Sequence, residues 1–503
     1  MMDISKIKTL SDLKKTDYKS RSIKDELRDN MITSLKNNID PFEGIFGYDE
    51  TVLPELQTSI LSRHNILLLG LRGQAKTRIA RLLVNLLDEY IPAIEGSDLN
   101  EDPFDPITNE TKRKIKELGD EIKIKWIHRS ERYTEKLATP DVTVSDLIGD
   151  VDPIKAATLK LPYSDERVIH FGLIPRSHRS IFVINELPDL QARIQVSLFN
   201  ILQESDIQIR GFKIRLPLDI QFVFTANPED YTNRGSIVTP LKDRIDSQIL
   251  THYPRSISVS QRITEQEAKI TAHQNSSVVV YPLVKEIIEQ IAIEARSSEY
   301  VDEKSGVSAR LTISAYENII SFAERRKIIN NEQKVCCRIN DIVGAIPAIT
   351  GKVELVFEGE QEGHLKVANI LIGKAIKSVF EKNFPSPETI KKKKELNPYS
   401  SVTAWFSKNN TVDILSSASN EEYKNILMSI PGLQKIVEKY QPDSDENLSL
   451  LYMEFILHGL SEYSQLSKLR LETGFQFKDM LSSMFTINEM EETDPEDDPD
   501  YFK

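Results

Sequence analysis

The chain is poor in cysteine and in long apolar segments. Among its 503 residues the only cysteines are Cys336 and Cys337, which are adjacent in a stretch whose pattern predicts a helix. Neighbouring helical positions point about 100° apart, so we expect two buried small side chains there rather than a disulfide or a metal site. A reducing cytoplasm fits this usage. No run of about 18 apolar residues occurs, and the N-terminus lacks a signal's apolar core, so we expect neither a membrane span nor a secretory signal.

The chain also lacks an excess of basic residues. Lysine and arginine number 64 against 77 aspartates and glutamates, which gives a formal net charge of −13. Because nucleic acids and anionic membranes attract basic surfaces, we expect no general binding to either. A hydrophobic fraction of 40% and a charged fraction of 28% are typical of a soluble globular protein. The length predicts roughly two to four folded units.

The first half of the chain reads as an α/β domain behind a polar lead-in. Residues 1–40 are charge-dense with short helical patterns, and we interpret them as a helical lead-in rather than a domain. Within 41–254, apolar β-branched runs at 65–70, 180–186 and 220–227 alternate with amphipathic stretches such as that at 78–87. This alternation predicts a parallel sheet covered by helices on both faces.

The second half reads as helical. Residues 255–350 show no strand-like runs, and the apolar spacing at 278–298 and 310–330 predicts a small α-helical domain. Residues 351–485 form a predicted, mostly helical C-terminal domain, in which the basic run from Lys391 to Lys394, flanked by prolines, marks a mobile connection. Residues 486–503 are strongly acidic and are predicted to be disordered.

The segment GLRGQAKT follows the predicted strand at 65–70 and precedes a predicted helix. It fits the phosphate-loop template G-x-x-x-x-G-K-[ST], in which backbone N–H groups cradle phosphates, the lysine reaches the β- and γ-phosphates and the hydroxyl binds Mg²⁺. The predicted nucleotide-contacting residues are Gly70, Leu71, Arg72, Gly73, Gln74, Ala75, Lys76 and Thr77. Ala75 replaces the final glycine, and its methyl group is tolerable if φ is negative there. The alternative reading is an ordinary strand-to-helix turn.

A second motif follows the apolar strand at 181–184. There Asn185 and Glu186 occupy the place where a phosphate-loop ATPase holds Mg²⁺ and polarises the attacking water. Asn185 carries no charge with which to hold the metal, whereas Glu186 is placed as the base that orients the water. Asp189 is a candidate substitute carboxylate, although a solvated surface role is favoured for it.

Three further polar residues complete the constellation. Asn227 follows the next apolar strand, where its side chain is expected to face the γ-phosphate. Arg244 lies near the end of the α/β segment, where an arginine can reach a phosphate in a neighbouring subunit; a surface ion pair is the alternative. Arg310 begins a predicted helix of the second half and is expected to bend back over the nucleotide.

With these elements in this order, the sequence resembles the AAA+ superfamily, and most closely the clade of the magnesium chelatase I subunit and the MoxR ATPases. Residues 41–48 look like the family's segment that packs on adenine, with Phe46 and Gly47 at the nucleotide. Residues 182–204 look like its Walker B strand and following helix. Residues 204–231 look like its hairpin before sensor 1, with a turn at Gly211 and Phe212. Segments 143–156 and 170–180 look like its insertion in the second helix.

The resemblance covers roughly residues 41–350 and implies roles for the motif residues. Walker A falls on Gly70 to Thr77, Walker B on Asn185 and Glu186, sensor 1 on Asn227, the arginine finger on Arg244 and sensor 2 on Arg310; Arg234 is a further candidate interfacial arginine. It implies ATP and Mg²⁺ as cofactors, with Thr77 and Asn185 on the metal side. It also implies a hexameric ring with ATP between subunits, an α-helical lid after the α/β domain, and hydrolysis that moves the lid.

Several functions fit such an ATPase. The first is a MoxR-like, chaperone-type protein that remodels, activates or loads metal into a partner. Members of this family often act with a von Willebrand A domain, which must here lie on another polypeptide because the segment from Asp413 to Ser417 has the wrong spacing for its metal motif. The alternatives are a magnesium chelatase ATPase subunit, a transcription regulator, for which the G-A-F-T-G-A loop is missing, and a nucleotide switch with weak hydrolysis, as Asn185 suggests.

Overall fold

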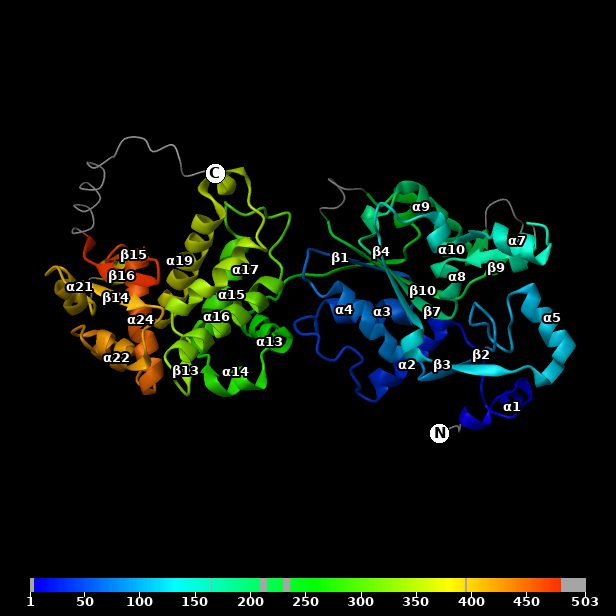
Figure 1. The fold of residues 1–503 in the computed structure, drawn as a ribbon, viewed down its shortest axis with the longest axis horizontal. Helices are drawn as coiled ribbons and strands as arrows, with labels where there is room; N and C mark the ends of the chain where they lie inside the picture. Colours follow the sequence, from blue (N-terminus) through cyan, green and yellow to red (C-terminus); the bar gives the residue numbers. More distant parts are fainter. Residues whose placement is uncertain (1–3, 164, 209–214, 229–235, 394–395, 481–503) are drawn as a thin grey trace. The chain divides into compact units, whose positions relative to one another are not determined.

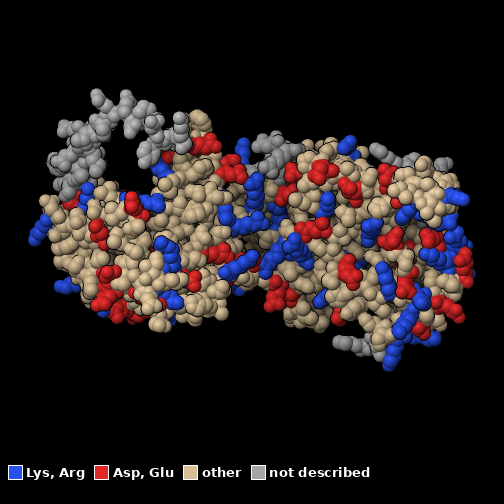
Figure 2. Space-filling view, in the orientation of Figure 1, with Lys and Arg blue, Asp and Glu red and all other residues tan. Residues whose placement is uncertain are grey.

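The computed structural model describes residues 4–163, 165–208, 215–228, 236–393 and 396–480. The chain forms two compact units, Met1–Tyr253 and Pro254–Lys503 (Figure 1). Each unit has its own buried apolar clusters. In the described ranges, no helix is long and apolar enough to cross a membrane. Basic and acidic side chains are interspersed over the face of the first unit that Figure 2 shows.

The first unit is built on a five-stranded sheet in the order β11-β1-β10-β7-β4. The strands are β1 (Ile66–Leu69), β4 (Tyr133–Leu137), β7 (Ser180–Asn185), β10 (Ile220–Ala226) and β11 (Ser247–Leu250). Every neighbouring pair is parallel. All positions of β7 and β10 are buried, as expected for central strands of a sheet covered on both faces. The predicted parallel α/β sheet is therefore confirmed.

Alternate residues of the strands feed two apolar clusters on opposite faces of this sheet. Ile66 and Leu68 of β1 and Val183 of β7 pack in one cluster, together with residues of the helix after β1. Leu67 of β1 and Phe182 of β7 pack in the other cluster. Since successive side chains of a strand point to opposite faces, this sorting fixes which residues meet on each side.

Helices and small strand pairs surround the sheet. The helices are α1 (Leu10–Lys14), α2 (Ile23–Lys36), α3 (Val52–Leu61), α4 (Lys76–Leu82), α5 (Asn109–Leu118), α6 (Val144–Leu147), α7 (Pro153–Leu159), α8 (Leu173–Arg176), α9 (Ala192–Ser197), α10 (Phe199–Glu204) and α12 (Thr239–Lys242). The antiparallel pairs are β2 (Tyr90–Ile94) with β3 (Ile124–His128), β5 (Gly149–Val151) with β6 (Ile169–Phe171), and β8 (Asp206–Gln208) with β9 (Arg215–Pro217). The β8–β9 pair confirms the predicted hairpin strands; the predicted turn at Gly211 and Phe212 lies outside the described residues.

Helix α2 lies in the segment interpreted as a lead-in, yet it is part of the first unit's core. Ser22 caps it by accepting a hydrogen bond from the backbone N–H of Asp25. Ile23, Leu27 and Met31, one per helical turn, are buried in the cluster that also contains β1 side chains. Residues of α2 therefore form part of the hydrophobic core of the first unit.

The second unit is mainly helical, with one apolar cluster running from Val278 to Phe477. Its helices are α13 (Ile257–Glu267), α14 (Ala272–Ser277), α15 (Pro282–Arg296), α16 (Arg310–Ile329), α17 (Ile346–Thr350), α18 (Phe357–Glu362), α19 (His364–Asn383), α20 (Pro387–Lys393), α21 (Ser400–Phe406), α22 (Asn420–Met428), α23 (Leu433–Tyr440) and α24 (Glu446–Glu462). This cluster includes side chains from both sides of residue 350. The predicted boundary between a lid domain (255–350) and a C-terminal domain (351–485) therefore stays a prediction.

Parts of the second unit differ from the sequence-based expectation. Cys336 lies in a two-residue strand, β13 (Val335–Cys336), which pairs with β12 (Val278–Val279), so the predicted helix there is wrong. Both cysteines are free, and Cys337 is fully buried. The C-terminal part also contains an antiparallel sheet, β14 (Val412–Leu415), β16 (Gly474–Lys478) and β15 (Ser467–Leu471). Lys391–Lys393 end α20 instead of forming a loop, whereas Lys394 and the acidic residues 486–503 lie outside the described ranges.

Candidate nucleotide-binding site

The loop between β1 and α4 is closely covered by side chains at Gly70. A Cβ at this position would lie 2.0 Å from Thr251 Oγ1 and 2.2 Å from Gln74 Oε1, so a larger residue would have to displace these two side chains. Gly73 has φ 74° and Ala75 has φ 58°, both in the left-handed region. The negative φ that would have made Ala75 unstrained is therefore absent. Despite this strain, α4 begins directly after Ala75, at Lys76.

Side chains from outside the motif hold this loop. Tyr48 is buried, and its hydroxyl donates toward the carbonyl oxygens of Gln74 (3.0 Å) and His252 (2.8 Å). Burial raises the pKa of Tyr48, which keeps the hydroxyl protonated and able to donate. Thr251 Oγ1 donates to Gln74 Oε1 at 2.7 Å. Tyr48 is the last residue of the segment 41–48 expected near adenine, but its contact with the loop was not predicted, and no motif marked Thr251.

Lys76, Asn227 and Glu186 form a continuous hydrogen-bonded chain. The buried ammonium of Lys76 donates to Asn227 Oδ1 at 2.7 Å and to the carbonyl oxygens of Leu71 (3.0 Å) and Gly70. Asn227 Nδ2 donates to Glu186 Oε2 at 2.8 Å. Three residues far apart in the sequence thus meet where β1, β10 and β7 end. Crevices at the carboxyl ends of parallel strands are the usual ligand sites of α/β folds.

Glu186 itself has an unusual backbone. Its φ of 55° places a non-glycine residue in the left-handed region directly after β7. Its backbone N–H donates to Thr225 Oγ1 at 3.2 Å, which ties this turn to the neighbouring strand β10. Strained backbone of this kind persists where the surroundings fix it, often at functional positions.

Asn185 contacts a carboxylate that the sequence analysis did not identify. Its Nδ2 donates to Glu135 Oε1 at 2.7 Å, while its Oδ1 accepts from Thr225 Oγ1 at 3.0 Å. Glu135 belongs to the adjacent strand β4 and also accepts from Arg81 of α4 and from the Tyr133 hydroxyl. The candidate substitute, Asp189, lies in the short helical turn Leu187–Asp189. A pairing that depends on strand register leaves no motif, so no sequence signal pointed to Glu135.

The remaining predicted residues lie in several places. Thr77 is half-buried in the first turn of α4, and Phe46 and Gly47 are half-buried just before Tyr48. Arg234 lies outside the described residues. Arg310 is the exposed first residue of α16 in the second unit.

Arg244 is held within its own unit. Its guanidinium lies 4.9 Å from the centre of the Phe199 ring and donates to Gln203 Oε1 (3.0 Å) and to the Pro240 carbonyl oxygen (2.7 Å). This places Arg244 against α10, and within the described residues it contacts an amide, a carbonyl and an aromatic ring; its role as an arginine finger stays a prediction.

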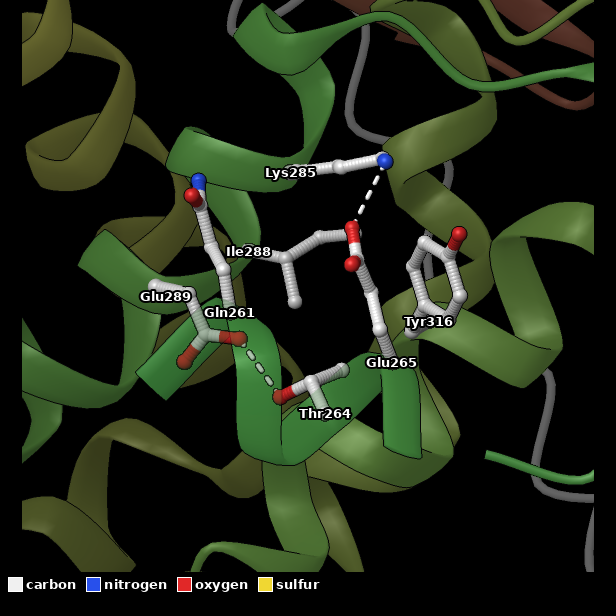
Figure 3. A pocket seen from close by; sticks show the side chains of 7 residues that line it. All are labelled: Gln261, Thr264, Glu265, Lys285, Ile288, Glu289 and Tyr316. Carbon is white, nitrogen blue, oxygen red and sulfur yellow. Dashed lines mark hydrogen bonds and ion pairs between the residues drawn. The ribbon is translucent and has the colours of Figure 1, made fainter. Parts of the chain in front are cut away.

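A small cavity in the second unit offers a contrasting site. Figure 3 shows Lys285 reaching Glu265 (2.6 Å) and Thr264 reaching Glu289 (2.6 Å), beside Tyr316. Burial raises the pKa of Glu289. The cavity has a volume of about 10 Å³, which is room for a single water molecule.

Known proteins show similarity to this chain. Residues 65–245 match the family model described as AAA domain (dynein-related subfamily). The magnesium-chelatase subunit ChlI of Cyanophora paradoxa is 24% identical over 274 residues, which cover 52% of this chain and 74% of that protein.

Two solved structures illustrate the similarity further. A putative ATPase from Cytophaga hutchinsonii is 16% identical, with 69% of this chain and 96% of that chain covered and a TM-score of 0.29. A complex of the magnesium chelatase subunits BchI and BchD is 18% identical, with 64% and 98% covered and a TM-score of 0.33. Residues 65–245 of this chain therefore match an AAA domain, and the chain is similar in sequence to a magnesium-chelatase I subunit.

Proposed function

We propose that this chain binds Mg²⁺–ATP at residues 70–77 and hydrolyses it, within a ring-shaped homo-oligomer, to remodel, activate or load metal into a partner protein. The observation that carries this proposal is the chain from Lys76 through Asn227 to Glu186. It joins a buried cation suited to phosphate, an amide suited to the γ-phosphate, and a carboxylate suited to orienting water.

The loop fits the phosphates of a nucleotide. Gly73 and Ala75 have φ of 74° and 58°, and successive N–H groups in loops of this kind can form a concavity suited to an anion. Lys76, now bonded to loop carbonyls, exchanges these partners for the β- and γ-phosphate oxygens. Thr77 in the first turn of α4 and Asn185 at the end of β7 are the residues suited to the metal side. Mg²⁺ held there would neutralise charge that develops on the phosphates.

In the catalytic cycle we assign distinct roles to the side chains. Glu186 orients the attacking water and accepts its proton, and Asn227 holds both Glu186 and the γ-phosphate in line. Lys76 stabilises the negative charge of the transition state. Arg244 acts on the site of a neighbouring subunit, and Arg310 acts from the helical unit.

The first test separates binding from turnover. Lys76→Ala should weaken ATP binding at least about 10-fold, because a hydrogen-bonded buried charge is lost. Binding is measured with a fluorescent ATP analogue, and Lys112→Ala, at an exposed position on α5, is the matched control. Unchanged affinity in Lys76→Ala would refute the site.

Glu186→Gln should bind ATP but turn it over about 10²- to 10⁴-fold more slowly, since the general base is lost. Turnover is measured as phosphate release, and retention of unhydrolysed ATP after gel filtration is the second readout. A turnover rate equal to that of the wild-type protein would show that Glu186 is not the general base.

A nucleotide switch with weak hydrolysis is the second candidate, favoured by the uncharged Asn185. ATP binding by the wild-type protein, with phosphate release no faster than that of the non-binding Lys76→Ala variant, would support the switch over the ATPase.

The partner is the least constrained part of the proposal, and we propose a protein with a von Willebrand A domain. The ATP-loaded Glu186→Gln protein is the appropriate bait for capturing it. Selective capture of such a protein, absent with Lys76→Ala, supports the remodelling role. Capture of a porphyrin-binding subunit instead would favour a chelatase.

A further inference from the structure

The Walker B position of this chain lacks a negative charge, and a neighbouring strand carries one in contact with it. We propose that Glu135 of β4 supplies the carboxylate that Asn185 lacks, so that the two side chains act as one acid–amide pair toward the Mg²⁺ of bound ATP. In this proposal Glu135 is a positioning residue, because it acts on the metal through Asn185 and a water molecule. The inference depends on the proposed nucleotide binding.

Strand register places the pair on the face of the sheet that α4 covers. In the parallel pairing of β4 with β7, Glu135 lies opposite Val183 and Leu137 opposite Asn185. Val183 belongs to the apolar cluster that includes Ile79 of α4. Asn185, two residues along from Val183, points to the same face. The pair therefore faces the helix that follows the phosphate loop.

Helix α4 links Glu135 to the predicted metal ligand Thr77. Arg81 of α4 donates to both carboxylate oxygens of Glu135, from Nε to Oε2 at 2.9 Å and from Nη2 to Oε1 at 3.2 Å. Thr77 and Arg81 are four residues apart and so lie on the same side of the helix. Glu135 therefore lies beside the helical face that carries Thr77, about one turn further along.

The directions of the hydrogen bonds let the negative charge of Glu135 act through the amide of Asn185, at the position where an aspartate would carry the charge itself. Thr225 Oγ1 donates to Asn185 Oδ1 (3.0 Å), which fixes the amide so that Nδ2 points to Glu135 Oε1 (2.7 Å). Charge on Glu135 polarises this amide and strengthens Asn185 Oδ1 as an acceptor. An acceptor of this kind suits a metal-bound water, and outer partners of this type are known to tune metal affinity.

The ion pair with Arg81 does not remove Glu135 from this role. The side chain of Arg81 is 64% exposed and that of Glu135 is 24% exposed. Ion pairs with one partner this open to solvent contribute little to stability, so Arg81 can turn away as a divalent cation arrives. If Glu135 had only a structural role, joining β4 to α4 through its ion pair with Arg81, then loss of Arg81 should have the same effect as loss of Glu135.

The experiment compares metal dependence in Glu135→Gln and Arg81→Gln in the full-length chain. Affinity for a fluorescent ATP analogue is measured with Mg²⁺ and again with EDTA, and Mn²⁺ binding to the nucleotide complex is measured by electron paramagnetic resonance. Glu135→Gln should lower the metal affinity about 10-fold and leave metal-free nucleotide binding within about 2-fold. Arg81→Gln, which loses the ion pair but keeps the carboxylate, should retain wild-type metal affinity.

A charge swap completes the test. Glu135→Gln combined with Asn185→Asp returns one carboxylate and one amide to the same two positions, and metal affinity should recover to within about 3-fold of wild type. Unchanged metal dependence in Glu135→Gln, an equal loss in Arg81→Gln, or no recovery in the swap overturns the inference. A wild-type protein that binds the nucleotide neither with Mg²⁺ nor in EDTA would instead refute the proposed function.

Discussion

Ala75 holds a backbone conformation that favours glycine, directly before the helix of the phosphate loop. Its φ of 58° and ψ of 14° lie in the left-handed region, which costs an L-residue about 1–2 kcal/mol. In return, its methyl group packs against the apolar cluster that contains Ile79 and Leu83. The position thus exchanges local strain for a contact between the loop and the core beneath it.

Ala75→Gly should change the free energy of unfolding by less than about 1 kcal/mol, because relief of strain is offset by the greater freedom of glycine in the unfolded chain. Ala80→Gly, in the interior of α4, is the control and should destabilise by at least about 1 kcal/mol. Urea unfolding followed by Trp126 fluorescence, in a Trp405→Phe background, reports on the first unit. An equal loss in both variants would show that the left-handed conformation is not strained.

The residues of this site show which local features the sequence predicts and which it does not. Motif spacing placed Lys76, Glu186 and Asn227 at strand ends, and in the structure their side chains contact one another. The conformation of Ala75 and the contact of Glu135 with Asn185 were not accessible. The first depends on a dihedral angle and the second on pairing between strands about 50 residues apart in sequence, and neither leaves a local pattern.

At the scale of elements, α2 is attached to the sheet by a buried ion pair. Glu26 and Arg132 form two hydrogen bonds of 2.7 and 2.6 Å, and their side chains are 4% and 1% exposed. Glu26 also accepts from the backbone N–H of Asp88 at 2.7 Å. Removing one partner of such a pair leaves a buried charge without compensation.

Glu26→Gln should therefore lower the free energy of unfolding of the first unit by about 3 kcal/mol, measured with the same Trp126 reporter. Asp29→Asn is the matched control on the same helix: its partner is Arg21 at 3.0 Å, but its side chain is 55% exposed, so we expect a loss below about 1 kcal/mol. A Glu26→Gln loss no larger than that of Asp29→Asn would mean that α2 is not anchored through this pair.

The sequence predicts strands with clear apolar patterns. It does not predict very short strands or helices that carry buried polar side chains. The central strands β7 and β10 are buried at every position and mostly apolar, and this pattern alone indicated them. The two-residue strand β13 is too short to show any period, which is why Cys336 was read as helical. Residues 1–40 looked like a lead-in because a buried glutamate such as Glu26 cannot be told from a solvated one by sequence.

At the scale of the whole molecule, the proposed ring makes each active site depend on two chains. Within one chain, Arg244 lies against Phe199 and donates to Gln203, both on α10 of its own unit. If Arg244 serves a neighbouring subunit, its loss should leave ATP affinity within about 2-fold but lower turnover about 10³-fold, as for other arginine fingers. Arg193→Ala, an exposed arginine on α9, is the control and should keep wild-type turnover.

Mixing variants distinguishes action between subunits from action within one. Arg244→Ala chains keep an intact phosphate loop, and Lys76→Ala chains keep an intact Arg244, so a mixed ring contains some interfaces with both groups. Equimolar mixtures should release phosphate at a rate well above that of either variant alone, and the gain should vanish on dilution below the assembly concentration. If Arg244 acts only within its own chain, mixing gives no complete site and no gain, and the loss of turnover in Arg244→Ala would then reflect its contacts on α10.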